Sequence, residues 1–513
     1  MKTPAWLPAL ALTMSTVPPL TAQQGSGSGT IALREPDSPF IAFEVWVKAG
    51  SQNDPGGKEG LAALTANLLA EGSTTTDRYD AIRARLYPMA AGYGFTVDKE
   101  MTVFRGRVHR DNLEPYYALF RNAVLQPAFS DEDFQRVKTQ TVNFLERARR
   151  YSRDEELSKE LLFSMAYRGT PYEHPEEGYV QSVQSITLDD VKAFYRDHYV
   201  RHNLVVAVGG GYPGGFAERA RRDFDALPAR DVPAVPRPAP APPAGIKVLI
   251  VEKPTDATAI SLGFPYGLVR GQPDFFALMA ANAWLGEHRS SVSHLYQVIR
   301  EARGMNYGDY SYIEAFPLGY TTQEPPVNVA RRHQLFEIWI RPVSKTGADD
   351  LHDRALFATR AALRELTRLV DGGMTDSTLN ETKQYLHNFS VTYGSTVSRR
   401  LAYAVDDAFY GLPAPGFLAS IRPGLATLTR ENANAAIRRQ LQYRNLYLVF
   451  ITQDAEGLKR RLLSGEPSPI RYAGPKSAAH MAEDAEIASF PIPVREEDIT
   501  IIGINEVFEK GRS

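Results

Sequence analysis

Two segments of this chain repeat one another, and an internal repeat restricts the possible fold more than any other sequence feature. Residues 185–209 align without gaps with a later segment ending at Ile451, at an offset of 242 residues. A second match, at an offset of 245, pairs Asp131, Phe134 and Lys138 with Asp376, Leu379 and Lys383. Similar offsets at two separate places indicate a duplication. The sequence therefore predicts two copies of one unit.

A proline-rich segment lies between the two copies. Residues 228–245 contain seven prolines and almost no bulky apolar side chain, a composition that favours extended polyproline II and a semi-rigid spacer. The alternative, a long surface loop within one domain, is less consistent with a repeat on either side. We expect a first half over residues 30–227, this linker, a second half over 246–475 and a C-terminal tail over 476–513.

Both copies follow the same order of expected elements. Each begins with alternating apolar strands, continues with long amphipathic helices and ends in a buried strand. The expected strands are residues 41–47 and 204–208 in the first half and 246–251, 260–264 and 446–451 in the second. Thr187 and Thr429, each followed by acidic residues, are expected helix N-caps. Helices between strands that need not be parallel indicate an α+β fold. We predict two homologous halves, each of two α+β lobes with a sheet covered by helices, forming a half-clamshell.

Composition narrows the chemistry that the chain can carry. The 58 basic and 60 acidic side chains nearly balance, so we expect no nucleic acid partner. The chain has no cysteine, which excludes disulfides, thiolate nucleophiles and thiolate metal sites. Any metal must be held by His, Asp or Glu, and there are only ten histidines.

The first 22 residues have the layout of a secretory signal peptide. Lys2 precedes an apolar stretch over about residues 5–17, and Ala22 is the small residue at the expected cut. A membrane anchor is the alternative, but prolines interrupt the stretch, and it is shorter than the ~20 apolar residues that a span needs. We expect a secreted or periplasmic protein with no membrane span in the mature chain.

Residues 43–72 resemble a known family. Their strand, Ala-Gly-Ser turn, Asp-Pro-Gly-Gly segment and Gly-Leu-Ala helix start are similar to the opening of the insulinase (pitrilysin) family of zinc peptidases. In that family the helix carries His-x-x-Glu-His, whose histidines bind zinc and whose glutamate activates the metal-bound water. The corresponding positions here are Ala63, Ala66 and Asn67, so both histidines and the base are absent.

The resemblance also implies a third zinc ligand, a glutamate on a later helix. Residues 154–172 are similar to that region, and Glu160 takes the ligand position. Catalytic zinc needs about three protein ligands, so a single carboxylate does not hold it, and we expect no metal in this chain. A hydrogen-bonded or solvated helix carboxylate is the alternative role of Glu160. Two histidine pairs are expected to have structural or surface roles. His198 and His202 lie where a helix gives way to a strand, and His288 and His294 are six positions apart, a poor match to a helix face.

A motif over residues 293–312 resembles the second-half signature of the same family. A helix ending in Arg-Glu-x-Arg-Gly, with Gly304 as its expected terminator, precedes a strand with a tyrosine seven positions after the first arginine. The matching residues are Arg300 and Tyr307. In the family this pair reaches across a cavity to substrate at the zinc site, where its donors can orient a peptide carbonyl and stabilise an oxyanion. The alternative is a helix-end arginine that compensates the helix dipole and a half-buried strand tyrosine.

Some two-chain members of the family divide these parts between subunits. One subunit carries the zinc motif, and the other lacks it but supplies the Arg/Tyr pair, which is the pattern of this chain. The resemblance implies a non-zinc subunit of a heterodimeric zinc endopeptidase that helps bind a peptide substrate, with Arg300 and Tyr307 acting in trans and zinc in a homologous partner. No glycine-rich loop precedes the Arg helix, so a presequence-binding role is in doubt. The other hypothesis is a catalytically inactive scaffold or peptide-binding module of the same fold.

Overall fold

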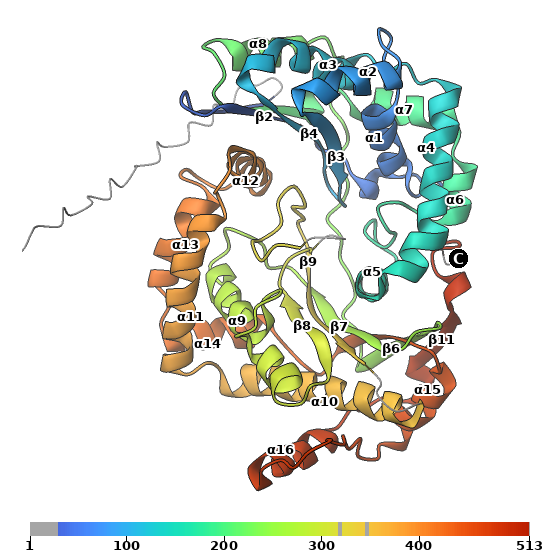
Figure 1. Cartoon of the computed structure of the whole chain (residues 1–513), viewed down its shortest axis with the longest axis vertical. Coiled ribbons are helices and arrows are strands. Elements are labelled where there is room, and N and C mark those ends of the chain that lie inside the picture. Colours follow the sequence, from blue (N-terminus) through green and yellow to red (C-terminus); the bar gives the residue numbers. More distant parts are fainter. Residues whose placement is uncertain (1–28, 317–320, 344–347, 512–513) are drawn as a thin grey trace, which may run out of the picture.

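The strands of the computed structural model, which describes residues 29–316, 321–343 and 348–511, form two sheets (Figure 1). The strands are β1 (Gly29–Arg34), β2 (Phe40–Val47), β3 (Gly92–Val97), β4 (Thr102–His109), β5 (Leu204–Gly210), β6 (Ile246–Glu252), β7 (Ala259–Tyr266), β8 (Asn306–Tyr312), β9 (Gln334–Pro342), β10 (Leu446–Thr452) and β11 (Ile499–Gly503). The first sheet has the order β1-β5-β2-β4-β3 and the second the order β11-β6-β10-β7-β9-β8.

The strand order confirms the internal repeat. In the second sheet β6, β10, β7, β9 and β8 follow one another as β1, β5, β2, β4 and β3 do in the first. The pairs β1–β5 and β6–β10 are parallel, whereas the strands that follow them are antiparallel in both sheets. Two lysines matched by the repeat make the same bond: Lys138 Nζ donates to the carbonyl of Ile186, and Lys383 Nζ to that of Leu428, both at 2.7 Å.

Helices link the strands and cover both sheets. They are α1 (Leu61–Glu71), α2 (Tyr79–Leu86), α3 (Leu113–Leu125), α4 (Asp131–Asn143), α5 (Asp154–Ala166), α6 (Val180–Ser185), α7 (Leu188–His198), α8 (Phe216–Phe224), α9 (Phe275–Gly286), α10 (Ala348–Gly372), α11 (Asp376–Phe389), α12 (Val397–Tyr410), α13 (Phe417–Ala426), α14 (Arg430–Gln440), α15 (Ala455–Ser464) and α16 (Ala478–Ala488). As predicted, Thr187 and Thr429 cap α7 and α14, where each side chain accepts a bond from a backbone N–H three residues on.

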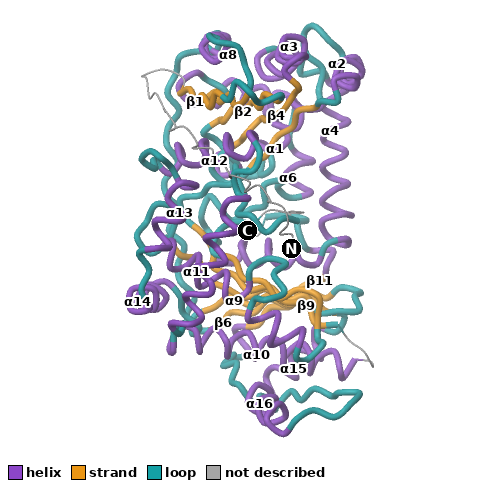
Figure 2. The backbone as a smooth tube through the Cα atoms, turned by 60° about the vertical axis from the view of Figure 1, so that its left-hand side comes forward, coloured by secondary structure: helices purple, strands orange, loops and turns teal. Residues whose placement is uncertain are grey.

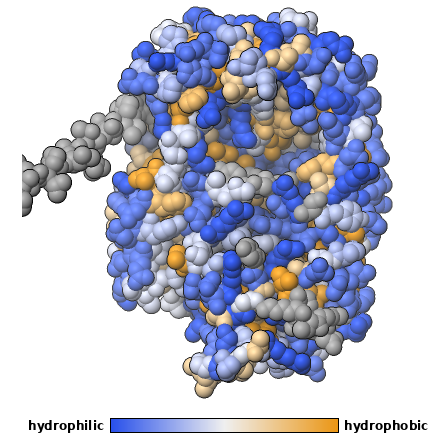
Figure 3. Space-filling view, viewed as in Figure 1, coloured by the Kyte–Doolittle hydropathy of each residue, from blue (hydrophilic) through white to orange (hydrophobic). Residues whose placement is uncertain are grey.

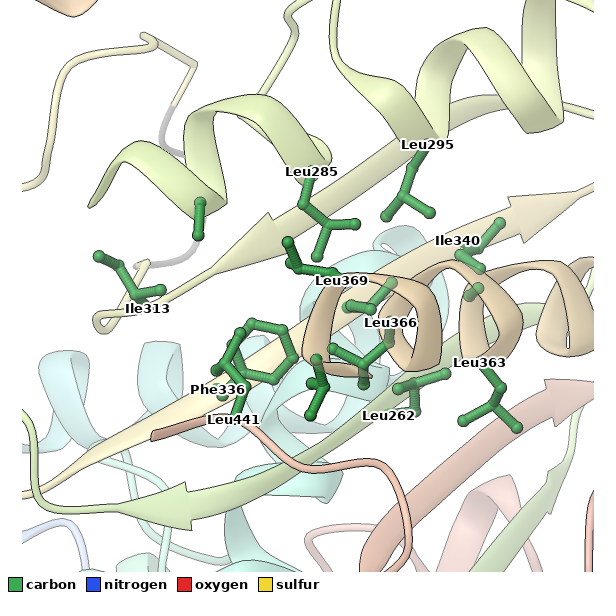
Figure 4. Close-up of a cluster of buried hydrophobic side chains, with 14 of the residues drawn as sticks. Leu262, Leu285, Leu295, Ile313, Phe336, Ile340, Leu363, Leu366, Leu369 and Leu441 are labelled. Carbon is green, nitrogen blue, oxygen red and sulfur yellow. The ribbon is translucent and has the colours of Figure 1, made fainter. Parts of the chain in front are cut away.

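The largest core packs α10 against the second sheet. Its apolar residues recur at helical spacing, so Leu363, Leu366 and Leu369 turn toward the strands (Figure 4). There they share one buried cluster with Leu262 of β7 and Phe336 of β9. Burying a side chain of this size contributes roughly 1.5–3 kcal/mol. This packing fixes the sheet that carries the strand of the Arg/Tyr motif.

Each sheet is covered on its other face by a helix from the opposite half (Figures 1 and 2). Alternate residues of β6 divide between two clusters: Val248 and Ile250 face the core with α10, whereas Leu249 and Val251 face α5 of the first half. In the first sheet, Trp46 lies in one cluster with Leu401 of α12. Each half therefore contributes one helix to the sheet of the other half. In the chain, α5 comes after α4 and α12 after α11, and α4 and α11 contain the residues matched at the offset of 245.

The predicted α+β class with two homologous halves is confirmed by this topology. The described strands form one sheet in each half. Within the described residues neither half forms a second sheet, and the helices α5 and α12 pack on the sheet of the opposite half. The predicted signal peptide, residues 1–22, lies outside the described residues. Within the described part of the chain, no helix has both the length and the apolar character needed to cross a membrane.

A buried carboxyl lies where α12 covers the first sheet. Glu44 of β2 is 4% exposed, and its Oε1 accepts a hydrogen bond from Asn328 Nδ2 at 3.0 Å. Burial raises the pKa of Glu44 from 4.5 to about 8. The Asn328 bond opposes this rise, and the nearby Asp406 of α12 adds to it.

Glu44→Gln is expected to stabilise the protein at pH 8 and to leave its stability near pH 5 almost unchanged. Between pH 4.5 and about 8 the folded protein holds a proton on Glu44 that the unfolded chain has released, so stability falls as pH rises through this window. Glutamine keeps the shape without a titratable proton. Thermal unfolding at both pH values, with the exposed Glu132→Gln as control, measures the effect. An equal change in Tm at both pH values would contradict it.

Candidate functional site

A cavity of about 430 Å³ lies between the two halves. From the first half it is lined by residues of α1, of the edge strand β3 and of α5; from the second it is lined by residues 314–316, Arg331 and Glu337 of β9. In the space-filling view the surface is mostly hydrophilic, and apolar residues gather at the recess between the upper and lower parts of the molecule (Figure 3). The cavity is therefore built jointly by both copies of the repeat.

Two of the three positions that match the zinc motif line this cavity. At the start of α1, two backbone N–H groups donate to the carboxylate of Asp54 at 2.7 Å each, which fixes where the helix begins. Ala63 and Asn67 lie on the cavity side of α1. Ala66 is buried and is not among the described residues that line the cavity. At the cavity α1 thus presents a methyl group and an amide, and neither is a metal ligand of the kind that the family motif carries.

Glu160 of α5 also lines the cavity, where two buried cations lie near its carboxylate and one of them, Arg149, hydrogen-bonds to it. Arg149 donates to Glu160 Oε2 at 3.1 Å, and Lys99 Nζ lies 3.9 Å from Oε1. Lys99 has no exposed surface, and Arg149 is 5% exposed. Arg149 lies on a π-helical segment, η4 (Phe144–Ser152), that continues α4, and wide turns of this kind are frequent at functional sites. Glu160 is therefore a paired carboxylate, the alternative role that the sequence left open.

The second half completes this group of charges. Glu176 lies 3.0 Å from Lys99 Nζ and 3.2 Å from an Arg331 nitrogen. Arg331 also donates two hydrogen bonds to Asp98. Burial alone would raise the pKa of Glu176, but Lys99 and Arg331 lower it to about 2. We refer to these residues as the charge cluster: Asp98, Lys99, Arg149, Glu160, Glu176 and Arg331.

These residues do not fit a catalytic zinc ion. Such an ion needs about three protein ligands, whereas α1 presents to the cavity the methyl group of Ala63 and the amide of Asn67, and Glu160 is hydrogen-bonded to Arg149. Of the helices packed against α1, namely α3, α4 and α7, only α4 has a described residue that lines the cavity, Thr141, and this residue carries no carboxylate. Over all the residues that the structure describes, no group of three His, Cys, Asp or Glu side chains could hold a metal.

Arg300 and Tyr307 lie on adjoining elements of the second half. Arg300 belongs to the π-helical turn η6 (Tyr296–Glu301), with its guanidinium carbon 4.7 Å from the ring centre of Tyr296. Gly304 ends this turn with φ of 59°, the left-handed conformation predicted for a terminating glycine. Tyr307 follows in β8, but its side chain is outside the described part of the structure. Arg300 is not among the described residues that line the inter-half cavity.

The second arginine of the same motif, Arg303, has a structural role. It is buried, and it pairs with Glu483 and Asp484 of α16 at 2.8 Å each. It also donates to the carbonyl of Val298 at 2.7 Å. Arg303 therefore attaches the motif to the C-terminal tail. Sequence reasoning did not find this pair, because its partners lie some 180 positions away in a region without a recognised motif.

Two family models match the chain. Residues 30–178 match the model described as insulinase (peptidase family M16), and residues 185–386 match the model described as peptidase M16 inactive domain. The second match begins inside the first half of the molecule, because α7 and β5, which follow residue 185, complete the first sheet.

Several curated relatives are named zinc proteases. An uncharacterised zinc protease of Streptomyces coelicolor is 26% identical over 281 residues, which are 53% of this chain and 60% of that protein. The uncharacterised zinc protease YmxG of Bacillus subtilis is 22% identical over 278 residues, 54% of this chain and 65% of that protein. The zinc protease PqqE of Helicobacter pylori is 24% identical over 260 residues, with shares of 49% and 57%. The chain thus spans less than two thirds of the length of these relatives.

Solved structures share the fold over nearly their whole length. A peptidase M16 inactive domain from Pseudomonas fluorescens has a TM-score of 0.72 at 24% identity and covers 85% of this chain and 98% of its own. A protease from Helicobacter pylori has a TM-score of 0.71 at 18% identity, with 85% and 100% covered. Because the two family models together match most of the chain, it belongs to the insulinase (peptidase M16) family, as a member without the zinc motif.

Proposed function

We propose that this chain is the non-zinc subunit of a heterodimeric M16-family endopeptidase whose homologous partner carries the zinc. The observation that supports this most is the replacement of the metal-holding residues by Ala63, Ala66 and Asn67 in an otherwise retained M16 fold. The Arg149 guanidinium adds to it, because it hydrogen-bonds to Glu160, the one carboxylate assigned to the metal. Such a chain keeps a cavity that can hold a substrate, but it lacks the zinc ligands and the base that activate water.

An extended peptide is the substrate class proposed for the cavity. The strand β3 is the edge of the first sheet, its side chains are exposed or half-buried, and residues 95–97 line the cavity. In the equivalent strand β8, the side chains of residues 308–312 are buried. An open edge lets a peptide add as a further strand through backbone hydrogen bonds. The peptide is therefore proposed to lie along β3.

Arg300 and Tyr307 are proposed to act on the substrate held by the partner. A guanidinium and a phenol hydroxyl are both hydrogen-bond donors, suited to a peptide carbonyl and to the negative charge that develops on its oxygen. The absence of Arg300 from the lining of this chain's own cavity is compatible with action in trans.

The compartment is proposed from the sequence. The signal-peptide layout of residues 1–22 and the absence of cysteine favour a secreted or periplasmic protein. No nucleic acid partner is proposed.

The purified chain alone is expected to show no peptidase activity and no stoichiometric zinc. Activity is expected when a homologue bearing His-x-x-Glu-His from the same host is added, because that chain supplies the metal site. Co-purification from the native host, followed by elemental analysis and peptide-cleavage assays of each chain and of the mixture, measures this. Activity or one equivalent of zinc in the isolated chain would contradict the proposal.

The inactive scaffold or peptide-binding module is the second function, and the open edge of β3 favours it as well. The same co-purification separates the two. If no zinc-bearing homologue is recovered and the chain still binds extended peptides, the result favours the binding-module function over the subunit function.

A further inference from the structure

The C-terminal tail adds a strand that lies outside the repeat. β11 pairs in parallel with β6, from Ile499 opposite Val248 to Gly503 opposite Glu252. It lies outside β6, which is the counterpart of β1. In the first sheet β1 is the edge strand, so β11 is an additional strand of the second sheet. The chain then continues to the first half, and its end lies between β11 and α6 (Figure 1). Residues 499–509 therefore connect the two halves at a place distinct from the linker.

Backbone hydrogen bonds join this segment to the start of α6. The N–H of Val180 donates to the carbonyl of Phe508 at 2.8 Å, and the N–H of Gln181 to that of Glu509 at 3.0 Å. These are donors at the first turn of a helix, which has no partner for them within itself. The tail thus caps a helix of the other half.

Side chains anchor the same segment to η4. Arg150 donates to the carbonyl of Val507 at 2.7 Å and pairs with Glu509 at 2.8 Å. Val507 and Phe508 are buried in one cluster with apolar residues of α5, α6 and the second sheet. The tail end is therefore packed as a core element although it lies at the end of the chain.

The anchoring reaches the charge cluster. The guanidinium carbon of Arg149 lies 5.7 Å from the ring centre of Phe508, a cation–π distance. The same guanidinium binds Glu160 in the cavity. Arg149 thus contacts the tail through Phe508 and the cavity through Glu160.

We propose that residues 499–509 are a strap that holds the cavity wall at η4, together with the helix α6, against the second sheet. While the strap is docked, Arg149 stays on Glu160 and the cavity is closed on that side. Release of the strap frees this wall without releasing α12, which packs on the first sheet independently of the tail. The strap is a conformational device distinct from the proposed peptidase role.

Amide hydrogen exchange of the full chain tests the strap. Val507→Ser with Phe508→Ser removes its apolar anchors, and exchange at Val180 and Gln181 is expected to accelerate at least about tenfold, while α12 keeps its rate. Glu497→Ala, on an exposed part of the tail, is the control without effect. Unchanged exchange at α6 would overturn the proposal, and so would equal acceleration at α6 and α12, because the tail would then add only global stability.

A covalent lock gives a test that does not depend on a weakened core. The chain has no cysteine, so Gln181→Cys with Glu509→Cys creates the only possible disulfide, between residues already joined by a hydrogen bond. Exchange in η4 and α6 is expected to be at least about threefold slower in the oxidised than in the reduced form. Equal rates in the two forms would show that the strap does not control this wall.

Discussion

Replacing Arg300 by alanine is expected to lower kcat/KM of the assembled two-subunit enzyme at least ~10²-fold, the order found for loss of an oxyanion donor. The guanidinium is proposed to bind the peptide carbonyl where charge develops, so most of the loss should fall in kcat. Steady-state cleavage of a peptide by the mixture of variant chain and zinc-bearing partner measures it. Metal content of the mixture should stay unchanged, because Arg300 is not assigned to the metal.

Two controls make this result specific. Arg438→Ala removes an exposed arginine of α14 and is expected to leave cleavage within about twofold of the wild type. Binding of the variant to the partner, followed by size-exclusion chromatography, shows whether subunit assembly is intact. Full activity of an assembled Arg300→Ala enzyme would reject a catalytic role for this residue and would favour the binding-module function.

The second large effect is expected in stability, on replacing Lys99 by methionine. Lys99 is fully buried, and its ammonium lies between Glu160 and Glu176. Removing it takes a fully buried cation from two carboxylates that are only 12% and 15% exposed and leaves each with a single arginine. Breaking a buried ion pair in this way costs about 3–5 kcal/mol of unfolding free energy. Urea denaturation at neutral pH measures the loss.

A double-mutant cycle identifies the cause of that loss. Adding Glu176→Gln to Lys99→Met removes one of the two carboxylates that have lost Lys99 and is expected to recover part of the stability. The control is Arg78→Ala, whose ion pair with Glu132 is exposed on both sides, so it should cost no more than about 1 kcal/mol. A Lys99→Met protein as stable as the Arg78→Ala protein would refute the argument from buried charge.

Much of the fold could be predicted because its signals are local or repeated. The Thr187 and Thr429 caps, the alternating strands and the terminating Gly304 each depend on a few adjacent residues. The repeat then extended these signals to a shared order of elements along both halves, whereas the order of strands within each sheet was not predicted. The exchange of α5 and α12 could not be predicted, because an amphipathic helix shows that it has an apolar face and not which sheet covers it.

The candidate site was predicted from the absence of the zinc ligands, and the charge cluster that lines the cavity was not predicted. Ala63 and Asn67 were found at the cavity because the surrounding turn and helix carry a recognisable pattern. Lys99, Arg149 and Arg331 were not found, since each comes from a different element and only the folded chain brings them together. A basic residue within an apolar environment has no sequence signature of its own. The pairing of Arg303 with α16 was missed for the same reason.

The exchanged helices bear on how such a chain could have arisen. A single ancestral copy would have had one apolar sheet face uncovered and one apolar helix face without a sheet. Two copies of it would satisfy both faces by trading helices across a two-fold axis, as domain-swapped dimers do. Joining two such copies through a segment like residues 228–245 would make that encounter intramolecular and independent of protein concentration. From then on the two copies were free to diverge, and here one keeps an open edge at β3 while the other buries β8.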